Sequence, residues 1–240
     1  RGARIPLPPL EEQKRIAAIL DKADDLQAKR RAAIAHLDSL TQSIFLDMFG
    51  QEPGEGPPLG ETLSTAAIFT DGDWVESKDQ DPDGDVRLLQ LADIGDGRFL
   101  DKSARFLTSE KAVELRCTLL EPGDILIARM PDPLGRACLF PGIDQPCVTV
   151  VDVCIIRVTD GVDRDWLVAA INSAGVRRQI ARRATGTTRS RISRGNLGKV
   201  RLRIPPLEQQ RAFASRVRSV RHAHEATSCT TAAKVNLAQS

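Results

Sequence analysis

One stretch near the C-terminal end of the chain combines residue types that suit contact with a polyanion. Between Arg182 and Asn196 the sequence places arginines beside a glycine and several serine and threonine residues. Arginine can form two hydrogen bonds to a guanine edge, while hydroxyl and main-chain N–H groups bind phosphate oxygens. Each phosphate neutralised in this way makes binding salt-dependent. The stretch therefore predicts a DNA-binding loop.

The distribution of charge supports the same interpretation. Formal net charge is only +2, but residues 71–101 hold ten acids against three bases, and residues 157–203 hold twelve bases against three acids. Such asymmetry is typical of a protein that presents one surface to a polyanion, although solvated surface charge without a ligand is the alternative. The predicted DNA-binding residues are Arg129, Arg136, Arg178, Arg182, Arg183, Thr187, Thr188, Arg189, Arg191, Ser193, Arg194 and Lys199.

The sequence lacks the patterns of a catalytic or metal site. The Pro131–Asp132 pair follows a predicted strand, but no Glu-x-Lys pattern completes a nuclease site, so we expect a proline-fixed loop that presents Arg129 and Arg136. No Walker sequence, G-x-S-x-G, or methyltransferase tetrapeptide occurs. His222 and His224 are two residues apart and point to different sides of a helix. We predict a non-enzymatic protein with no cofactor or metal of its own.

A repeated segment frames the chain. Residues 8–14, Pro-Pro-Leu-Glu-Glu-Gln-Lys, return almost unchanged as residues 205–211, Pro-Pro-Leu-Glu-Gln-Gln-Arg. Proline disfavours the α conformation in the residue before it, yet is tolerated in the first turn of a helix. Each copy therefore predicts an extended segment that stops and leads into a helix.

Both predicted helices carry an apolar seam. Over residues 10–49 apolar side chains recur at alternating steps of three and four, which is the heptad pattern of a coiled coil. Forty helical residues extend roughly 60 Å. The second seam fades after His224. The predicted helix-interface residues are Ile16, Ile19, Leu26, Leu37, Leu40, Ile44, Phe213, Val217 and Val220.

Between the helices we expect a mixed α/β domain. Predicted strands cover residues 86–91, 124–129 and 148–158, and predicted helices cover 109–115 and 166–183. The expected fold class is an α/β target recognition domain flanked by long coiled-coil helices. The expected segments are 1–9 (tail of a preceding module, or hinge), 10–50 (long helix), 51–60 (Pro- and Gly-rich linker), 61–204 (α/β domain) and 205–240 (second helix).

Composition is that of a soluble protein from a reducing compartment. The 240 residues are 41% hydrophobic, and no apolar run approaches the roughly 20 residues that span a bilayer. None of the five cysteines forms a C-x-x-C pair, and the N-terminus is charged where a signal peptide would be apolar. We expect a cytoplasmic location.

Several segments together resemble the specificity subunits of type I restriction-modification systems. Residues 5–13 and 43–50 are similar to the family's conserved region. The segments 88–94 (Leu-Leu-Gln-Leu-Ala-Asp-Ile), 122–127 (Pro-Gly-Asp-Ile-Leu-Ile) and 186–193 (Gly-Thr-Thr-Arg-Ser-Arg-Ile-Ser) are similar to its target recognition domains. The resemblance covers nearly the whole chain.

The resemblance implies a non-catalytic protein that reads double-stranded DNA. In this family two recognition domains each read half of a split target, and conserved helices set the gap and dock modification subunits. Those subunits methylate adenine with S-adenosylmethionine, and a restriction subunit can join them. This chain has one such domain, so we expect either the C-terminal half of a longer subunit or a half-subunit that forms a homodimer through its helices. A helical scaffold that does not read DNA and an enzyme acting on DNA by itself are the alternatives.

Overall fold

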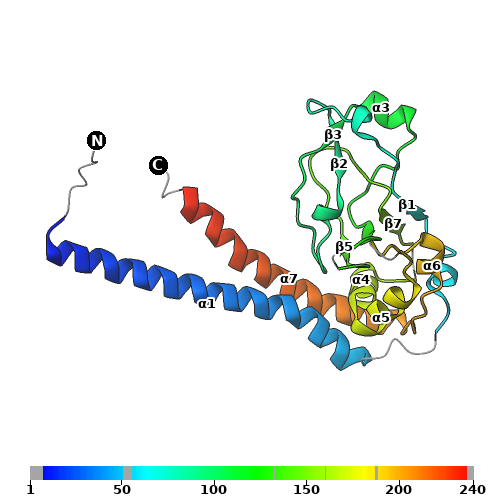
Figure 1. The fold of residues 1–240 in the computed structure, drawn as a ribbon. Coiled ribbons are helices and arrows are strands. Elements are labelled where there is room, and N and C mark those ends of the chain that lie inside the picture. Colours follow the sequence, from blue (N-terminus) through cyan, green and yellow to red (C-terminus); the bar gives the residue numbers. More distant parts are fainter. Residues whose placement is uncertain (1–7, 51–55, 132, 160, 187–188, 237–240) are drawn as a thin grey trace. The chain divides into compact units, whose positions relative to one another are not determined.

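The computed structural model describes residues 8–50, 56–131, 133–159, 161–186 and 189–236 (Figure 1). Thr187 and Thr188, both predicted to bind DNA, lie outside the described residues. The chain divides into two units: Arg1–Thr41 with Arg218–Ser240, and Gln42–Val217. The second unit extends beyond the expected 61–204 domain, because the end of the first long helix and the start of the last contribute to its core.

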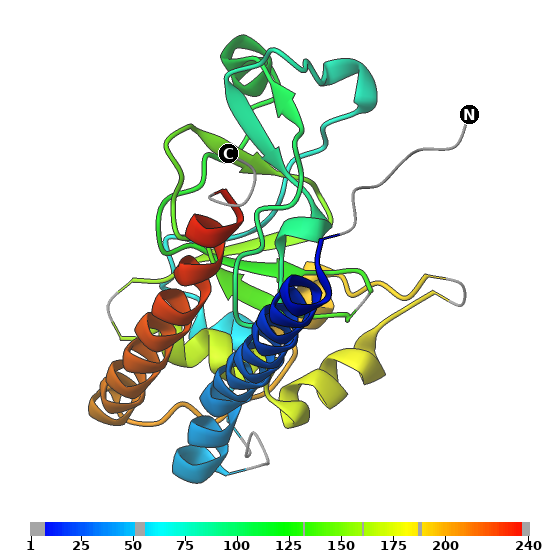
Figure 2. The same ribbon diagram turned by 90° about the vertical axis from the view of Figure 1, so that its left-hand side faces the viewer.

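The two long helices begin where the repeated prolines predict. Helix α1 covers Leu10–Phe49 and helix α7 covers Leu207–Asn236, each directly after a double proline (Figures 1 and 2). Gly50 has φ of +81°, a conformation that glycine adopts without strain and that ends α1. Helix α7 continues beyond His224, where the apolar seam fades. Within the described residues no helix is both long and apolar enough to cross a membrane.

The α/β unit is built on two sheets. All neighbouring strands of the four-stranded sheet are antiparallel, whereas the three-stranded sheet contains one parallel pair, β2 with β6. In spatial order the first sheet is β1 (Ile68–Asp71), β7 (Val153–Arg157), β4 (Ile125–Ala128) and β5 (Ala137–Leu139), and the second is β3 (Phe106–Leu107), β2 (Val86–Leu89) and β6 (Cys147–Thr149).

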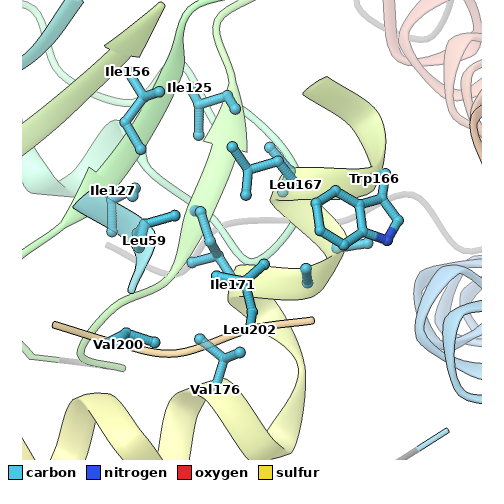
Figure 3. Close-up of a cluster of buried hydrophobic side chains, with 14 of the residues drawn as sticks. Leu59, Ile125, Ile127, Ile156, Trp166, Leu167, Ile171, Val176, Val200 and Leu202 are labelled. Atoms are coloured by element: carbon cyan, nitrogen blue, oxygen red, sulfur yellow. The ribbon is translucent and has the colours of Figure 1, made fainter. Parts of the chain in front are cut away.

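Strand β4 lies in the middle of the core, because both faces of its sheet are covered. Ile125 and Ile127 point to the helical side, where they pack with Leu167 and Ile171 of helix α4 (Arg164–Asn172) (Figure 3). The alternate side chains of β4 belong to a second cluster on the opposite face. Side chains of a strand alternate between its two faces, so a strand that is buried on both faces needs a continuous run of apolar residues.

Shorter helices complete the unit. In Figure 1, α3 lies at the end of the unit next to β2 and β3, and α4, α5 and α6 gather at the opposite end. The remaining elements are α2 (Leu59–Thr62), α3 (Ser109–Glu114), α5 (Ala174–Arg183), α6 (Arg194–Gly198) and the 3-10 turns Ser77–Asp79 and Leu91–Asp93.

The mixed α/β prediction is confirmed, but two predicted elements are each split. The predicted strand 148–158 is wrong as a single strand: residues 151–152 form a turn, and β6 and β7 belong to different sheets. The predicted helix 166–183 is interrupted at Ser173, whose ψ of 148° is extended. Its hydroxyl then accepts from Val176 N–H and caps α5.

Two motif aspartates are structural. Asp93 is fully buried and accepts hydrogen bonds from the main-chain N–H groups of Gln90, Lys102 and Ser103 at 2.7 to 2.8 Å. Asp124 is buried beside Arg157, whose guanidinium donates to both carboxylate oxygens at 2.8 Å. The motifs around residues 88–94 and 122–127 therefore hold loops and strands together.

Candidate DNA interface

The predicted DNA-binding loop is a narrow excursion between α5 and α6. We call residues 182–194 the basic loop, of which Thr187 and Thr188 are outside the described part. Thr185 and Arg191 exchange two main-chain hydrogen bonds of 2.9 and 2.8 Å, which close its two arms. Gly186 has φ of +101°, and a Cβ atom there would lie 2.5 Å from the carbonyl oxygen of Arg189. The turn therefore requires glycine at this position.

The base of the basic loop is fixed in the core. Ile192 is fully buried, and the Ser193 hydroxyl caps α6 by accepting from Asn196 N–H at 3.1 Å. The Asn196 side-chain amide donates to the carbonyl of Arg183 at 3.1 Å and so joins the two ends. The arms project beside α5 (Figure 2). A loop anchored at its base presents its arginines at defined positions.

Two carboxylates of the sheet region bind arginines of this loop. The Arg191 guanidinium lies 3.1 Å from Asp152, and that of Arg194 lies 3.8 Å from Asp71. Arg194 also donates to the carbonyl of Phe69 at 2.9 Å and lies over its ring. Both pairs are partly exposed, so they orient the side chains without removing them from solvent.

The other predicted residues of this region form an exposed cationic surface. Arg183 is half-buried and donates to the carbonyl of Gln179 at 3.1 Å. The remaining predicted side chains on α5, α6 and the loop are exposed, namely Arg178, Arg182, Arg189, Ser193, Arg194 and Lys199. The structure thus brings most of the predicted set together around one loop.

Arg129 and Arg136 do not belong to this surface. Arg129 is 3% exposed, pairs with Asp71 at 3.3 Å and donates to the carbonyls of Val151 and Ile192. Arg136 is 7% exposed, and its donors reach three main-chain carbonyl oxygens between 2.6 and 3.0 Å. The prediction that the 129–136 loop presents two arginines is wrong, because both side chains turn inward to satisfy main-chain oxygens.

A groove that the sequence did not indicate lies next to the basic loop. It has a volume of about 670 Å³ and includes Trp74, Gln90 and Asp152 in its lining. Asp152 connects it to the loop through Arg191. Trp74 is 67% exposed, although its large ring favours burial. Glutamine can bind an adenine edge and tryptophan can stack on a base, so the groove offers the residue types of base contact.

Asp73, in the same groove, differs from the carboxylates that bind arginines. Its oxygens accept from Thr118 N–H at 3.0 and 3.1 Å. Burial raises the pKa of Asp73 to about 6, against a smaller lowering by the Thr118 hydrogen bond. The groove therefore contains a carboxyl group that takes up a proton in mildly acidic solution.

The predicted helix-interface residues fall into three groups. Phe213 and Val217 are buried in the α/β unit, where the Phe213 ring lies 5.8 Å from Phe45 and 5.7 Å from Phe49. Leu37, Ile44 and Val220 are partly buried. The others, Ile16, Ile19, Leu26 and Leu40, are exposed large apolar residues of α1. An exposed apolar stripe of this kind favours a further helix or protein against it.

The described side chains offer no alternative chemistry at this site. Within the described part of the chain, no three His, Cys, Asp or Glu residues gather as a metal site. Burial raises the pKa of the Cys138 and Cys154 thiols to about 12, which disfavours the reactive thiolate. The arrangement is suited to binding a polyanion through arginines.

Comparison with known proteins identifies a family to which this chain is similar. Residues 3–36 match the family described as type I restriction modification DNA specificity domain. The chain is 25% identical to the type I restriction enzyme MjaVIII specificity subunit of Methanocaldococcus jannaschii, over 90% of this chain and 55% of that protein. The chain is similar to type I specificity subunits. The resemblance inferred from the sequence motifs is thereby confirmed.

Solved structures share the fold. The HsdS subunit from Thermoanaerobacter tengcongensis aligns with 94% of this chain and 55% of its own at TM-score 0.55 and 21% identity. A chain from a study of complex assembly and conformational transition of the type I R-M system aligns with 97% of this chain and 58% of its own, at TM-score 0.59 and 23% identity. The chain therefore spans a little over half the length of these relatives.

Proposed function

We propose that this chain is a non-catalytic DNA recognition subunit of a type I restriction-modification complex, reading one half of a bipartite target. The observation that carries the proposal is the basic loop, a rigidly based segment whose exposed arginines stand beside a groove with Trp74 and Gln90. Phosphate contacts position a protein on DNA, and contacts to base edges provide specificity. The loop supplies the first kind of contact, and the groove and Arg191 supply the second.

The long helices are proposed to set the distance between half-sites and to dock modification subunits, which would use S-adenosylmethionine for methylation. The exposed apolar residues of α1 support this part, since they require a partner surface. A homodimer through the helices would supply the second recognition domain with twofold symmetry. The alternative arrangement is one longer subunit of which this chain is half. A restriction subunit can join either complex.

The test is the salt dependence of DNA binding by the chain in complex with its modification subunit. The variant Arg182→Gln/Arg189→Gln should bind a random duplex about tenfold more weakly near 0.1 M salt. The slope of log affinity against log salt should fall by about 1.8, because two phosphate contacts are lost. Fluorescence anisotropy of a labelled duplex measures both quantities.

The matched control is Lys102→Gln/Arg105→Gln, which removes two exposed charges outside the basic loop. Its affinity and slope should change by less than half as much, since those charges act only from a distance. Equal losses in the two variants would reject the basic loop as the DNA contact. Negligible DNA affinity in every form of the complex would favour the scaffold.

A further inference from the structure

A second cavity in the α/β unit takes no part in the proposed DNA contact. Its volume is about 370 Å³, and it lies between the end of α1, helix α4, the extended segment 202–206 and the start of α7. Phe45, Phe49, Trp166 and Val176 supply much of its apolar wall. Cavities of about 300 to 1,000 Å³ with an apolar lining and a few polar groups are typical ligand sites.

The wall contains a buried hydrogen-bond donor without an acceptor. Trp166 is 1% exposed, and its indole Nε1 has no hydrogen-bond partner among the residues that the structure describes. Figure 3 shows this nitrogen directed away from the aliphatic cluster of Leu167, Ile171 and Ile125. Buried tryptophan N–H groups usually find a partner, because a buried unpaired donor is destabilising. The cavity provides the room for an acceptor.

The remaining lining limits the chemistry of an occupant. Apart from Trp166, the polar side chains of the wall are Ser173, Arg203 and Gln209, and Ser173 already accepts from Val176 N–H. Arg203 is exposed and is the charged member of the lining, which contains no carboxylate. The cavity is therefore complementary to an apolar group that carries a neutral or anionic oxygen.

We propose that the cavity receives an apolar side chain of the modification subunit, with a carbonyl or carboxylate oxygen accepting from Trp166 Nε1. The inference rests on the proposed function, which assigns that subunit to the helices. Met48 and Gly50 at the end of α1, and Gln209 on α7, themselves line the cavity. A partner that contacts the last turn of α1 and the first turn of α7 would meet the cavity, and Arg203 favours an acidic segment there.

The test uses fluorine NMR of the full chain labelled with 5-fluorotryptophan. The chain has two tryptophans, so Trp74→Phe assigns the Trp166 resonance. Unlabelled modification subunit is then added in steps. We expect the Trp166 resonance to shift in proportion to complex formation. An unchanged Trp166 resonance in a fully formed complex would overturn the inference.

A second arm isolates the N–H group. Replacement of Trp166 by benzothienylalanine keeps the ring shape and exchanges the N–H for sulfur. We expect the affinity for the modification subunit to fall about five- to tenfold, as for one hydrogen bond, without loss of thermal stability in the chain alone. The control, Val113→Ala, changes an exposed apolar residue of α3 outside the cavity lining and should keep the affinity within twofold. Unchanged affinity in the isostere, or loss confined to stability of the free chain, would reject the assignment.

The two proposals fail in different ways. If the unaltered chain forms no complex with the modification subunit, the partner named under the proposed function is wrong. The proposed occupant of the cavity is then rejected as well. If the complex forms and neither arm responds, the proposed function stands and the cavity assignment alone is rejected.

Discussion

Two arginine-bearing loops of this chain look alike in sequence and differ in structure. The 129–136 loop and the basic loop both contain arginines and a glycine. In the first, Arg129 and Arg136 are buried and bonded to main-chain carbonyls. In the second, Arg182 and Arg189 are exposed, and Arg191 and Arg194 are held by carboxylates. Residue type alone therefore did not separate a structural arginine from one that can bind DNA.

The difference comes from the surroundings of each guanidinium. The Arg136 guanidinium donates to the carbonyl oxygens of Ile94, Leu91 and Pro133, so the fold needs its donors where they are. The basic loop closes its own main chain through Thr185 and Arg191, and the guanidinium groups of Arg182 and Arg189 are exposed to a ligand. Three predictions test this contrast.

Replacing Arg136 with alanine should lower the free energy of unfolding by about 3 kcal/mol, because the carbonyl oxygens of Ile94 and Pro133 lose this buried donor and that of Leu91 keeps Ile94 N–H alone. Arg182→Ala should change it by less than about 0.5 kcal/mol, as for an exposed side chain. Urea denaturation followed by circular dichroism measures both. Similar losses in the two variants would remove the contrast between the loops.

A similar contrast exists among the carboxylates. Asp71 and Asp152 bind arginines, whereas Asp73 does not. Its pKa is raised to about 6 from 3.8, so the folded protein binds the proton more tightly than the unfolded chain. This contribution to stability is complete below about pH 4 and is lost as pH rises through 6. Asp73→Asn should abolish it, a change on the order of 1 kcal/mol after allowance for solvent screening at this partly exposed group.

The measurement for Asp73 is urea unfolding at pH 4.5 and pH 7.5 of the unaltered chain and of Asp73→Asn. The stability of the variant relative to the unaltered chain should increase with pH. Parallel pH profiles would show that Asp73 is not desolvated in the folded protein.

Asp152→Asn should have the smallest effect and act mainly on DNA. Removing this carboxylate frees Arg191, 3.1 Å away, and deletes one negative charge beside the proposed contact. We expect DNA affinity to rise two- to threefold at low salt, with less than about 1 kcal/mol change in stability. Asp152→Glu, which keeps the charge, should behave as the unaltered chain. Weaker binding by Asp152→Asn would mean that the pair positions Arg191 rather than competing with DNA for it.

The sequence predicted well what depends on local pattern. The double prolines and Gly50 mark the bounds of the long helices, and the turns around Gly123 and Gly142 separate the strands of the first sheet. The break between α4 and α5 was not predictable, because the apolar pattern runs on through Ser173. The separation of β6 from β7 was likewise not predictable, because one continuous apolar segment supplies strands to two different sheets.

The candidate site was predictable only in part. The basic loop could be identified from composition, since its residues are adjacent in sequence. Its partners Asp71 and Asp152 lie elsewhere in the chain and come to the loop through the sheets. The groove with Trp74 and Gln90 combines segments from both sheets, and nothing in the local sequence of Trp74 indicates its exposure. The burial of Arg136 depends on carbonyl groups around residues 91–94, which spacing does not reveal.

Selection of bound sequences from a randomised duplex library, with the chain in complex with its modification subunit, tests whether this chain reads DNA. We expect enrichment of a short motif, present as two inverted copies at a fixed gap if half-subunits pair, and loss of enrichment in Arg182→Gln/Arg189→Gln. A complex that forms fully and enriches no sequence would contradict DNA reading by this chain and would leave a helical scaffold as its function.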